Sequence, residues 1–333
     1  MLSDRKTKYQ ELEKARGAKV ITYVTGDRPG LETQIHSEVL DHLVHHLDLL
    51  GSTKRIALFL YTRGGDTLAA WSIVNLLRQF CEELEVVVPS KAHSAGTLIC
   101  LGADQIVMTK QATLGPIDPS ITGPLNPQIP GAGGQARVPV SVEAINGYVE
   151  FSRSALGKGD QSGMNALLAQ LATQVHPLVL GSVYRSRAQI RMLAKRLVKR
   201  HLKKDEEIEE VLNFLCSESG SHDYTIFRRE ARDELHLHVE KPTDAGYTLI
   251  KSIYDDIAKE LELNTPYDPN VVLGTNQSAP YAFRRGLVES NDGGCHVHVS
   301  EGTLHRHQVT LPPGIVQRAI QDERTFEGWR HEP

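Results

Sequence analysis

Cysteine and net charge are both scarce in this chain of 333 residues. The four cysteines are widely spaced and form no CxxC pair, so the sequence indicates neither a zinc ribbon nor a disulfide framework. The formal net charge is −4, which provides no overall basic field for nucleic acid or acidic lipid. We therefore expect free thiols in a reducing compartment and no nucleic-acid partner.

Long apolar runs are also missing. No uninterrupted apolar stretch approaches the roughly 18 to 20 residues that cross a bilayer. The first residues, MLSDRKTKYQELEKARGAK, are charged and contain no apolar signal core. We therefore expect a cytoplasmic protein that does not interact with membranes.

Strand and helix patterns alternate between residues 31 and 120. The continuous apolar runs RIALFLY, EVVVPS and QIVMT are typical of strands that are buried on both faces. Helical spacing separates them, in ETQIHSEVLDHLVHHLDLL, TLAAWSIVNLLRQF and SAGTLICLGA. This alternation predicts an α/β domain with a mainly parallel sheet.

Composition divides the chain into three parts. Residues 1–30 are a charged lead-in that ends in a strand, KVITYVTG. Residues 31–204 form the predicted core, with a Gly/Pro-rich loop at 121–139 and a helical arm after it. Residues 205–333 are predicted to be a short helical unit and a loop-rich tail with a hairpin around NDGG. Because long structureless loops inside compact domains are usually functional or disordered, we expect loop 121–139 to cover a substrate entrance.

Ser94 lies between a strand pattern and a short helix pattern. In VVVPSKAHSAGTLICLGA, a sharp turn would present its hydroxyl at a helix N-terminus, which favours developing negative charge. The nearest general motif is the G-x-S-x-G turn, but Ala92 replaces its first glycine. A serine before a helix is more commonly an N-cap, so a nucleophile and a cap both remain open.

A second turn, Gly64-Gly65, follows the strand RIALFLY and precedes a helix. Consecutive glycines allow the backbone to approach a ligand closely, although a tight turn alone could also require them. Neighbouring parallel strands would bring this turn beside Ser94. The N–H groups of Gly65 and Ala95 could then converge on a carbonyl oxygen as an oxyanion hole.

These residues carry a family resemblance. YTRGGDTLAAWSIVNLLR and VVVPSKAHSAGTLICLGADQIVMTKQATLGPIDP resemble the Clp-fold serine peptidases of the crotonase superfamily, and most of all the serine dehydrogenase proteinase family, which is related to signal peptide peptidase A and caseinolytic protease. The resemblance is strong over residues 55–120 and looser through VHPLVLGSVYRSRAQIRMLAKRL.

The resemblance implies a Clp/crotonase-like spiral of β-β-α units with a mainly parallel sheet, followed by a helical C-terminal extension. It also implies Ser94 as the nucleophile and the Gly65 and Ala95 amides as oxyanion donors. Peptidases of this kind form homo-oligomers, act on peptides or unfolded protein and need no cofactor. The sequence has no Walker A motif, so an ATP-driven unfoldase or regulator would be a separate chain.

The sequence departs from the family pattern at two places. Arg63 occupies the position of a proline in the Clp-like turn. The segment GPIDP, where the Clp-type histidine would fall, contains Ile117 and Asp118 but no histidine. A Ser-His-Asp triad therefore cannot be assigned by position, and the general base has to come from elsewhere.

His176 is the first candidate for that base, and Lys158 is the alternative. Lys158 is the only lysine between residues 110 and 195, and a buried lysine can act as a base when its pKa falls. His176 lies in an apolar, helix-like segment and could accept a proton near neutral pH. His93 is a third candidate, although adjacent side chains such as those of His93 and Ser94 usually diverge. A solvated lysine and a hydrogen-bonded core histidine are the alternatives.

Two classes of function remain at this point. The first is a serine peptidase that forms an acyl-enzyme on Ser94. The second is a non-peptidase relative, either an acyl-CoA enzyme of the crotonase superfamily or an inactive oligomeric scaffold. Ser94 favours the peptidase, whereas the unassigned base keeps the scaffold open.

Histidines gather in two other places. His42 and His46 share a helix face but lack the glutamate of an HExxH motif. His296 and His298 share one strand face, with two more histidines nearby. A structural metal site is the alternative to an exposed histidine-rich hairpin. We expect the exposed hairpin and no metal.

A basic stretch runs from Arg185 to Lys204, and acidic residues follow it. Apolar spacing at Ile190, Leu193 and Leu197 predicts an amphipathic helix with a solvated basic face. Nucleic-acid contact and an oligomer surface are the alternative uses of such a face.

Overall fold

The protein is described from a computed structural model. The structure describes residues 2–117, 120–129, 137–156, 160–218, 221, 223–311 and 315–332. Two compact units make up the chain: unit 1 is Met1–Leu114 with Phe227–Pro333, and unit 2 is Gly115–Ile226. The expected core of 31–204 and the expected tail of 205–333 are therefore each divided between the two units.

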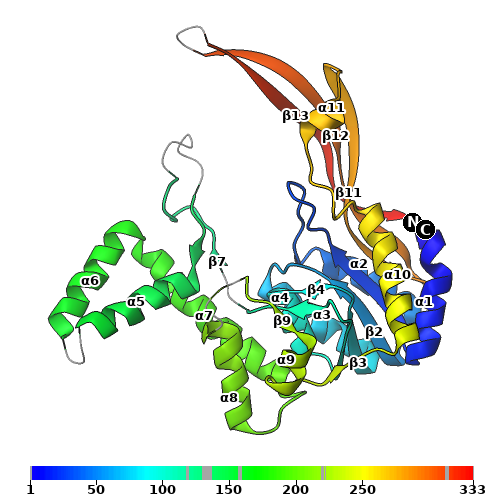
Figure 1. The fold of residues 1–333 in the computed structure, drawn as a ribbon, viewed down its shortest axis with the longest axis horizontal. Helices are drawn as coiled ribbons and strands as arrows, with labels where there is room; N and C mark the ends of the chain where they lie inside the picture. The colour runs from blue at the N-terminus through cyan, green and yellow to red at the C-terminus, as the bar shows by residue number, and fades with distance from the viewer. Residues whose placement is uncertain are drawn as a thin grey trace. The chain divides into compact units, whose positions relative to one another are not determined.

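Unit 1 is built on an eight-stranded sheet with the order β10-β5-β3-β2-β1-β11-β12-β13 (Figure 1). Its first five strands in this order pair in parallel, and the pairs from β1 onward to β13 are antiparallel. The strands are β1 Lys19–Thr25, β2 Thr53–Tyr61, β3 Cys81–Val88, β5 Gln105–Met108, β10 Val239–Glu240, β11 Ser278–Ser290, β12 Gly294–Leu311 and β13 Ile315–Glu332. The α/β class is thus confirmed, and the parallel part is the predicted one.

The helices of unit 1 confirm the pattern read between residues 31 and 108. They are α1 Leu2–Arg16, α2 Val39–Leu50, α3 Thr67–Phe80, α4 Ala95–Leu101, α9 Arg228–Asp233, α10 Asp244–Glu260 and α11 Pro269–Leu273. Three short strands complete the elements near them: β4 Lys91–Ala92, β6 Thr113–Leu114 and β9 Ile226–Phe227. The helix predicted within ETQIHSEVLDHLVHHLDLL begins only at Val39, because Ile35 instead forms a bridge with Gly65.

Strand β2 shows why the apolar runs are continuous. It pairs with β1 on one side and β3 on the other, and every residue from Ile56 to Tyr61 is buried. Alternate residues face opposite sides of the sheet. Phe59 packs in a cluster with side chains of α1 and α10, which lie side by side in Figure 1. Each large apolar side chain buried in this way contributes about 1.5–3 kcal/mol.

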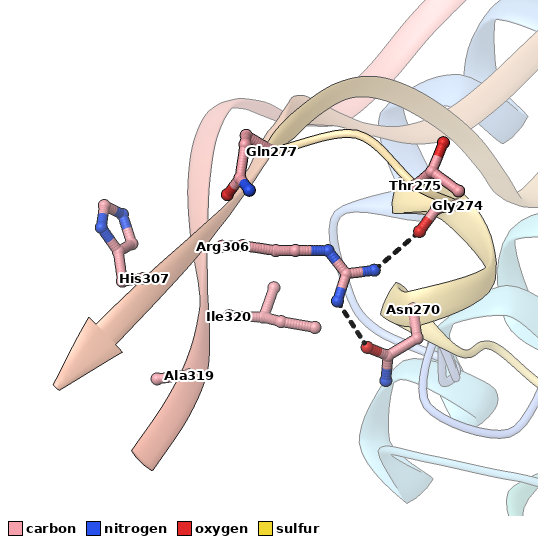
Figure 2. A pocket seen from close by; sticks show the side chains of 8 residues that line it. All are labelled: Asn270, Gly274, Thr275, Gln277, Arg306, His307, Ala319 and Ile320. Carbon is pink, nitrogen blue, oxygen red and sulfur yellow. Dashed lines mark hydrogen bonds between the residues drawn. The ribbon is translucent and has the colours of Figure 1, made fainter. Parts of the chain in front are cut away.

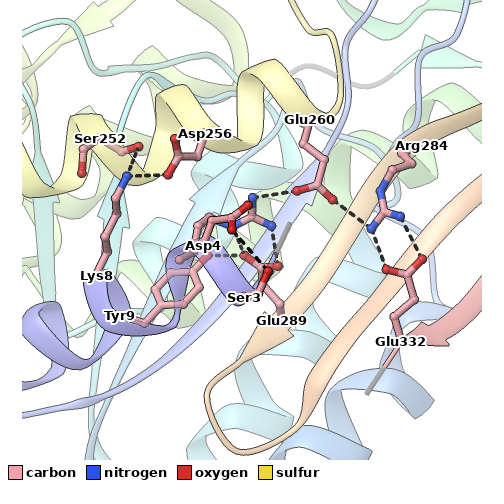
Figure 3. Close-up of polar contacts among 11 residues, drawn as sticks. Ser3, Asp4, Lys8, Tyr9, Ser252, Asp256, Glu260, Arg284, Glu289 and Glu332 are labelled. Carbon is pink, nitrogen blue, oxygen red and sulfur yellow. Dashed lines mark hydrogen bonds and ion pairs between the residues drawn. The ribbon is translucent and has the colours of Figure 1, made fainter.

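The predicted charged lead-in is helix α1, and it anchors a buried ion-pair network (Figure 3). Arg5 is fully buried and contacts Glu289 through Nε at 2.7 Å and Glu260 through Nη1 at 2.7 Å. Tyr9 donates its hydroxyl to Glu289, and Arg284 contacts Glu260 at 2.8 Å. Burial raises the pKa of Glu260, but Arg5 and Arg284 outweigh it and hold this pKa below its usual value.

The expected loop-rich tail is wrong for residues 278–290, 294–311 and 315–332, which form β11, β12 and β13 (Figure 1). The hairpin around NDGG is confirmed, since Ser290 pairs with Gly294 across the turn. Polar residues alternate with apolar ones on β12, where Cys295, Val297 and Val299 join the core. Because these short apolar side chains alternate with histidines and charged residues, the sequence pattern resembles that of a loop.

Unit 2 is mainly helical. Its elements are β7 Ser120–Ile121, β8 Val140–Ser141, α5 Val142–Leu156, α6 Gln161–Gln174, α7 Pro177–Val198, α8 Asp205–Asn213 and a π-helical turn Phe214–Glu218. Strands β7 and β8 pair at the two ends of the predicted loop 121–139, whose residues 130–136 lie outside the described residues. The amphipathic helix is confirmed, because α7 buries Ile190, Leu193 and Leu197.

None of the helices in the described ranges is, by itself, long and apolar enough to cross a membrane. Helices α6 and α7 reach the length and apolar content of a membrane span only when they are taken together. The two helices are bent by 104° at the break between them.

Candidate active site

The turn after β2 is fixed by backbone hydrogen bonds to Ile35. Ile35 N donates to Gly64 O at 2.8 Å, and Asp66 N donates to Ile35 O at 2.8 Å. A Cβ at Gly65 would lie 2.3 Å from Ile35 O, and its φ is +144°, so only glycine fits there. In a parallel bridge of this kind, the N–H of the central residue, Gly65, points away from the partner strand.

Ser94 has a backbone conformation that non-glycine residues rarely adopt. Its φ is +51° and its ψ is −115°, in the turn that leads into α4. Such conformations persist where surrounding structure enforces them, and they cluster at functional sites. Ser94 occupies the N-cap position, yet its side chain makes no capping hydrogen bond. Its half-buried hydroxyl has no hydrogen-bond partner among the described residues, which weighs against the simple capping role.

The two turns lie against each other. Thr62 bridges Ala92 in parallel, and a Cβ added at Gly96 would come within 2.5 Å of Thr62 Cγ2. A Cβ added at Gly64 would lie 2.7 Å from Ser94 Cβ and 3.2 Å from Ser94 Oγ. The structure thus brings the Gly64-Gly65 turn and Ser94 together, as the order of parallel strands predicts.

Two backbone donors flank Ser94 without acceptors. Ala95 is the first residue of α4, where a helical N–H has no acceptor within the helix. Within the part of the chain that the structure describes, neither the Ala95 N–H nor the Gly65 N–H has a hydrogen-bond partner. A hydroxyl beside two unpaired N–H groups can perform acyl transfer, with the amides stabilising the oxyanion.

Comparison with known proteins agrees with this geometry. Residues 1–132 match the model of the ClpP-like SDH-type serine proteinases. Residues 1–132 are thus similar to that family, and they make up less than half of the chain. The matched segment contains both turns of the candidate active site, with Ser94, Gly65 and Ala95.

Two curated relatives come from Methanocaldococcus jannaschii. The uncharacterized protein MJ0137 is 32% identical over 203 residues, which is 60% of this chain and 58% of the relative. The uncharacterized protein MJ1495 is 32% identical over 118 residues, which is 34% of this chain and 40% of the relative. The chain therefore covers less than two thirds of the length of either relative.

Solved structures give weaker likenesses. One is the 1510-N membrane-bound stomatin-specific protease bound to a substrate peptide, with 15% identity, 64% of this chain and 73% of that chain covered, and a TM-score of 0.39. Another is ClpP1 from Listeria monocytogenes, with 16% identity, 71% and 97% covered, and a TM-score of 0.38.

The other predicted residues near Ser94 and the Gly64-Gly65 turn differ in their surroundings. His93 Nε2 lies 2.8 Å from Thr113 Oγ1, so its ring contacts strand β6. Arg63 is exposed on the glycine turn. Ile117 is buried, and Asp118 lies outside the described residues.

Both candidates for the general base belong to unit 2. Lys158 lies outside the described residues. His176 is exposed and caps α7, where its Nδ1 accepts a hydrogen bond from Leu178 N at 3.2 Å. The expected core histidine is therefore a helix cap on the surface of unit 2.

A pocket of about 690 Å³ lies on unit 1, apart from the predicted site residues (Figure 2). Arg306 crosses it and donates to Gly274 O at 2.9 Å and to Asn270 Oδ1 at 3.4 Å. The lining residues are Asn270, Gly274, Thr275, Gln277, Arg306, His307, Ala319 and Ile320. No sequence motif marks this pocket, because segments from α11 to β13 build it.

Histidines form a second polar centre in unit 1. His296 is buried, which corrects the expectation of a fully exposed histidine-rich hairpin. Burial, together with neighbouring imidazoles, lowers the pKa of His46 to about 3 and that of His296 to about 4. Both rings are therefore neutral near pH 7.

Proposed function

We propose that the chain is a serine-type peptidase in which Ser94 is the nucleophile. The observation that carries this proposal is the positive φ of Ser94, whose unpaired hydroxyl lies against Gly64 beside two unpaired backbone N–H groups. A simple N-cap would bond its own helix and needs no such strain. The match of residues 1–132 to a serine proteinase family supports the same activity.

The chemistry follows from this arrangement. Ser94 Oγ attacks the carbonyl carbon of a peptide bond and passes its proton to a general base. The carbonyl oxygen becomes an oxyanion that accepts hydrogen bonds from Gly65 N–H and Ala95 N–H. Collapse of this intermediate breaks the C–N bond, and the amine leaves with the proton. Water then hydrolyses the acyl ester and restores the serine.

Lys158 is the base that we propose first, ahead of His176. A neutral histidine whose Nδ1 accepts a hydrogen bond carries its proton on Nε2, so neither nitrogen is free to accept another. His176 would have to abandon its cap of α7 to act as a base. The variant His176→Asn retains a capping side chain and separates the two roles. We expect it to keep peptidase activity, whereas Lys158→Met should abolish it.

We further propose that the chain works as a homo-oligomer on peptides or unfolded protein, within the crotonase superfamily and in the cytoplasm. The description of the family as ClpP-like supports an assembly, and so do large apolar side chains exposed on unit 2, such as Phe151 and Tyr184. A separate unfoldase or regulatory chain would supply folded substrates. Membrane and nucleic-acid partners are not expected.

Labelling with a fluorophosphonate probe tests the proposal. An adduct on Ser94 should form in the native protein and disappear in Ser94→Ala, with mass spectrometry of the peptides locating it. Ser90→Ala is the matched control, because this serine lies in the same segment and should not change labelling. Equal labelling of native protein and Ser94→Ala would contradict the proposal, and acyl-CoA binding would then test the crotonase-type alternative.

A further inference from the structure

Three histidines from distant parts of unit 1 meet at one point. His296 on β12 pairs across the sheet with His331 on β13, and their ring centroids are 4.6 Å apart. His45 projects from α2, and its ring centroid lies 5.0 Å from each of the other two. One ring nitrogen from each residue lies within 4.8 Å of the other two nitrogens.

The turn between β11 and β12 fixes the proton on His331. Its Nε2 lies 3.2 Å from Gly293 O. A carbonyl oxygen only accepts hydrogen bonds, so Nε2 has to carry the proton. In the neutral ring, Nδ1 of His331 therefore holds the free lone pair that a metal ion requires.

A chain of hydrogen bonds orients His296 in the same way. Its Nδ1 lies 3.0 Å from His46 Nε2, and His46 Nδ1 lies 2.8 Å from Ser290 Oγ. Ser290 Oγ also accepts the N–H of Gly293 at 2.9 Å. If each imidazole donates from Nδ1 along this chain, Nε2 of His296 is left with a lone pair. Histidines that bind metals characteristically donate their other ring nitrogen in this manner.

The room around the histidine rings and their exposure to solvent also suit a metal ion. A Cβ at Gly293 would lie 2.2 Å from His46 Nδ1, so the turn leaves room for this ring only because it is glycine. His296 is buried, whereas His45 and His331 are exposed. Tetrahedral zinc with Zn–N bonds of about 2.0–2.1 Å separates ligand nitrogens by about 3.3 Å. The two exposed rings can rotate to reach that spacing.

We propose that His45, His296 and His331 bind a divalent transition-metal ion, zinc first, which joins α2 to β12 and β13. Imidazole nitrogens suit zinc, nickel and copper, and three of them leave a fourth position for water. His46 acts as a positioning residue through its bond to His296. The site is independent of Ser94 and of the proposed peptidase activity.

Titration of untagged, metal-free protein with Co²⁺ tests the site, because tetrahedral Co²⁺ absorbs strongly in the visible range. We expect one ion per chain, with His45→Ala and His331→Ala each weakening binding at least tenfold. These two residues are exposed, so both variants should fold. His307→Ala is the matched control, since it removes an exposed histidine of β12 outside the cluster.

Zinc should also raise the melting temperature of the native protein and of Ser94→Ala. It should not raise the melting temperature of the double variant that carries both His45→Ala and His331→Ala. This readout separates the metal site from the peptidase proposal. Absence of Co²⁺ binding, or binding that the cluster variants leave unchanged, would overturn the proposal. A similar loss in His307→Ala would overturn it too, because the ion would then be bound nonspecifically by surface histidines.

Discussion

The two units differ in how much of their chain is buried. In unit 1 the central strand β2 is enclosed on both sides, and even Arg5 is fully buried. In unit 2 a small core of Val140, Val142 and neighbouring valines supports α5 and α7, and no residue of α6 is buried. Unit 1, the more buried of the two, carries Ser94 and the unpaired amides, which require fixed geometry. The helical unit instead exposes apolar surface, which suits contact with other chains.

Loss of Arg5 should give the largest effect on stability. Arg5→Met leaves Glu289 buried without its cation and Glu260 with Arg284 alone, so the free energy of unfolding should fall by about 3–5 kcal/mol. Urea denaturation measures it. The matched control is Lys8→Met on the same helix, which removes a half-exposed pair with Asp256 and should cost less than about 1 kcal/mol. Equal losses in both variants would contradict the buried network.

Gly65→Ala should come next, with a loss of about 3 kcal/mol from strain and overpacking against Ile35. Gly51→Ala is its control, because Gly51 also has a positive φ of +69° but nothing lies within 4 Å of an added Cβ. The control should lose about 1–2 kcal/mol, because its positive φ strains an alanine but the added Cβ meets no neighbour. Thermal and urea unfolding of both variants would compare them, and equal values would refute the close approach at Gly65.

Low pH should reduce the stability of unit 1, in part through Glu260. Its pKa is lower in the folded protein than in the unfolded chain, so this carboxylate stabilises the fold above about pH 4.5. As pH falls below that value, the unfolded chain takes up the proton first and this contribution is lost. Denaturation of native protein and Glu260→Gln from pH 7 to pH 3 should show a shallower decline in the variant. Parallel declines would count against this coupling.

Equivalent valine-to-alanine substitutions in the cores of the two units should reduce the free energy of unfolding by different amounts. Val87→Ala in β3 removes fully buried methyls and should cost about 2 kcal/mol. Val183→Ala in α7 removes methyls from the small core of unit 2 and should cost about half as much. Urea denaturation with probes in each unit would measure both. A larger loss for Val183→Ala would reverse the ranking of the units.

The smallest effect on stability should come from Tyr184→Ser. Tyr184 is 77% exposed, so the free energy of unfolding should change by less than about 0.5 kcal/mol. If this side chain contributes to an oligomer surface, the variant should nevertheless dissociate more readily. Light scattering after size-exclusion chromatography measures this, and an unchanged assembly would remove Tyr184 from that surface.

The sequence predicts the parallel half of unit 1 well, because strands such as β2 have strong, continuous burial patterns. The meeting of Gly65 with Ser94 was also predictable, since the carboxyl ends of adjacent parallel strands share one edge of a sheet. The burial of Arg5 was not, because a polar helix shows no apolar face in its pattern. His45 and His331 meet only through the antiparallel pairing of β11, β12 and β13, which the polar tail concealed.

A crystal structure with a peptide boronic acid would test the central claim most directly. The account predicts boron bonded to Ser94 Oγ and one boronate oxygen about 2.7–3.1 Å from both Gly65 N and Ala95 N. Boron on another residue, or an oxygen that contacts neither amide, would contradict the proposed active site.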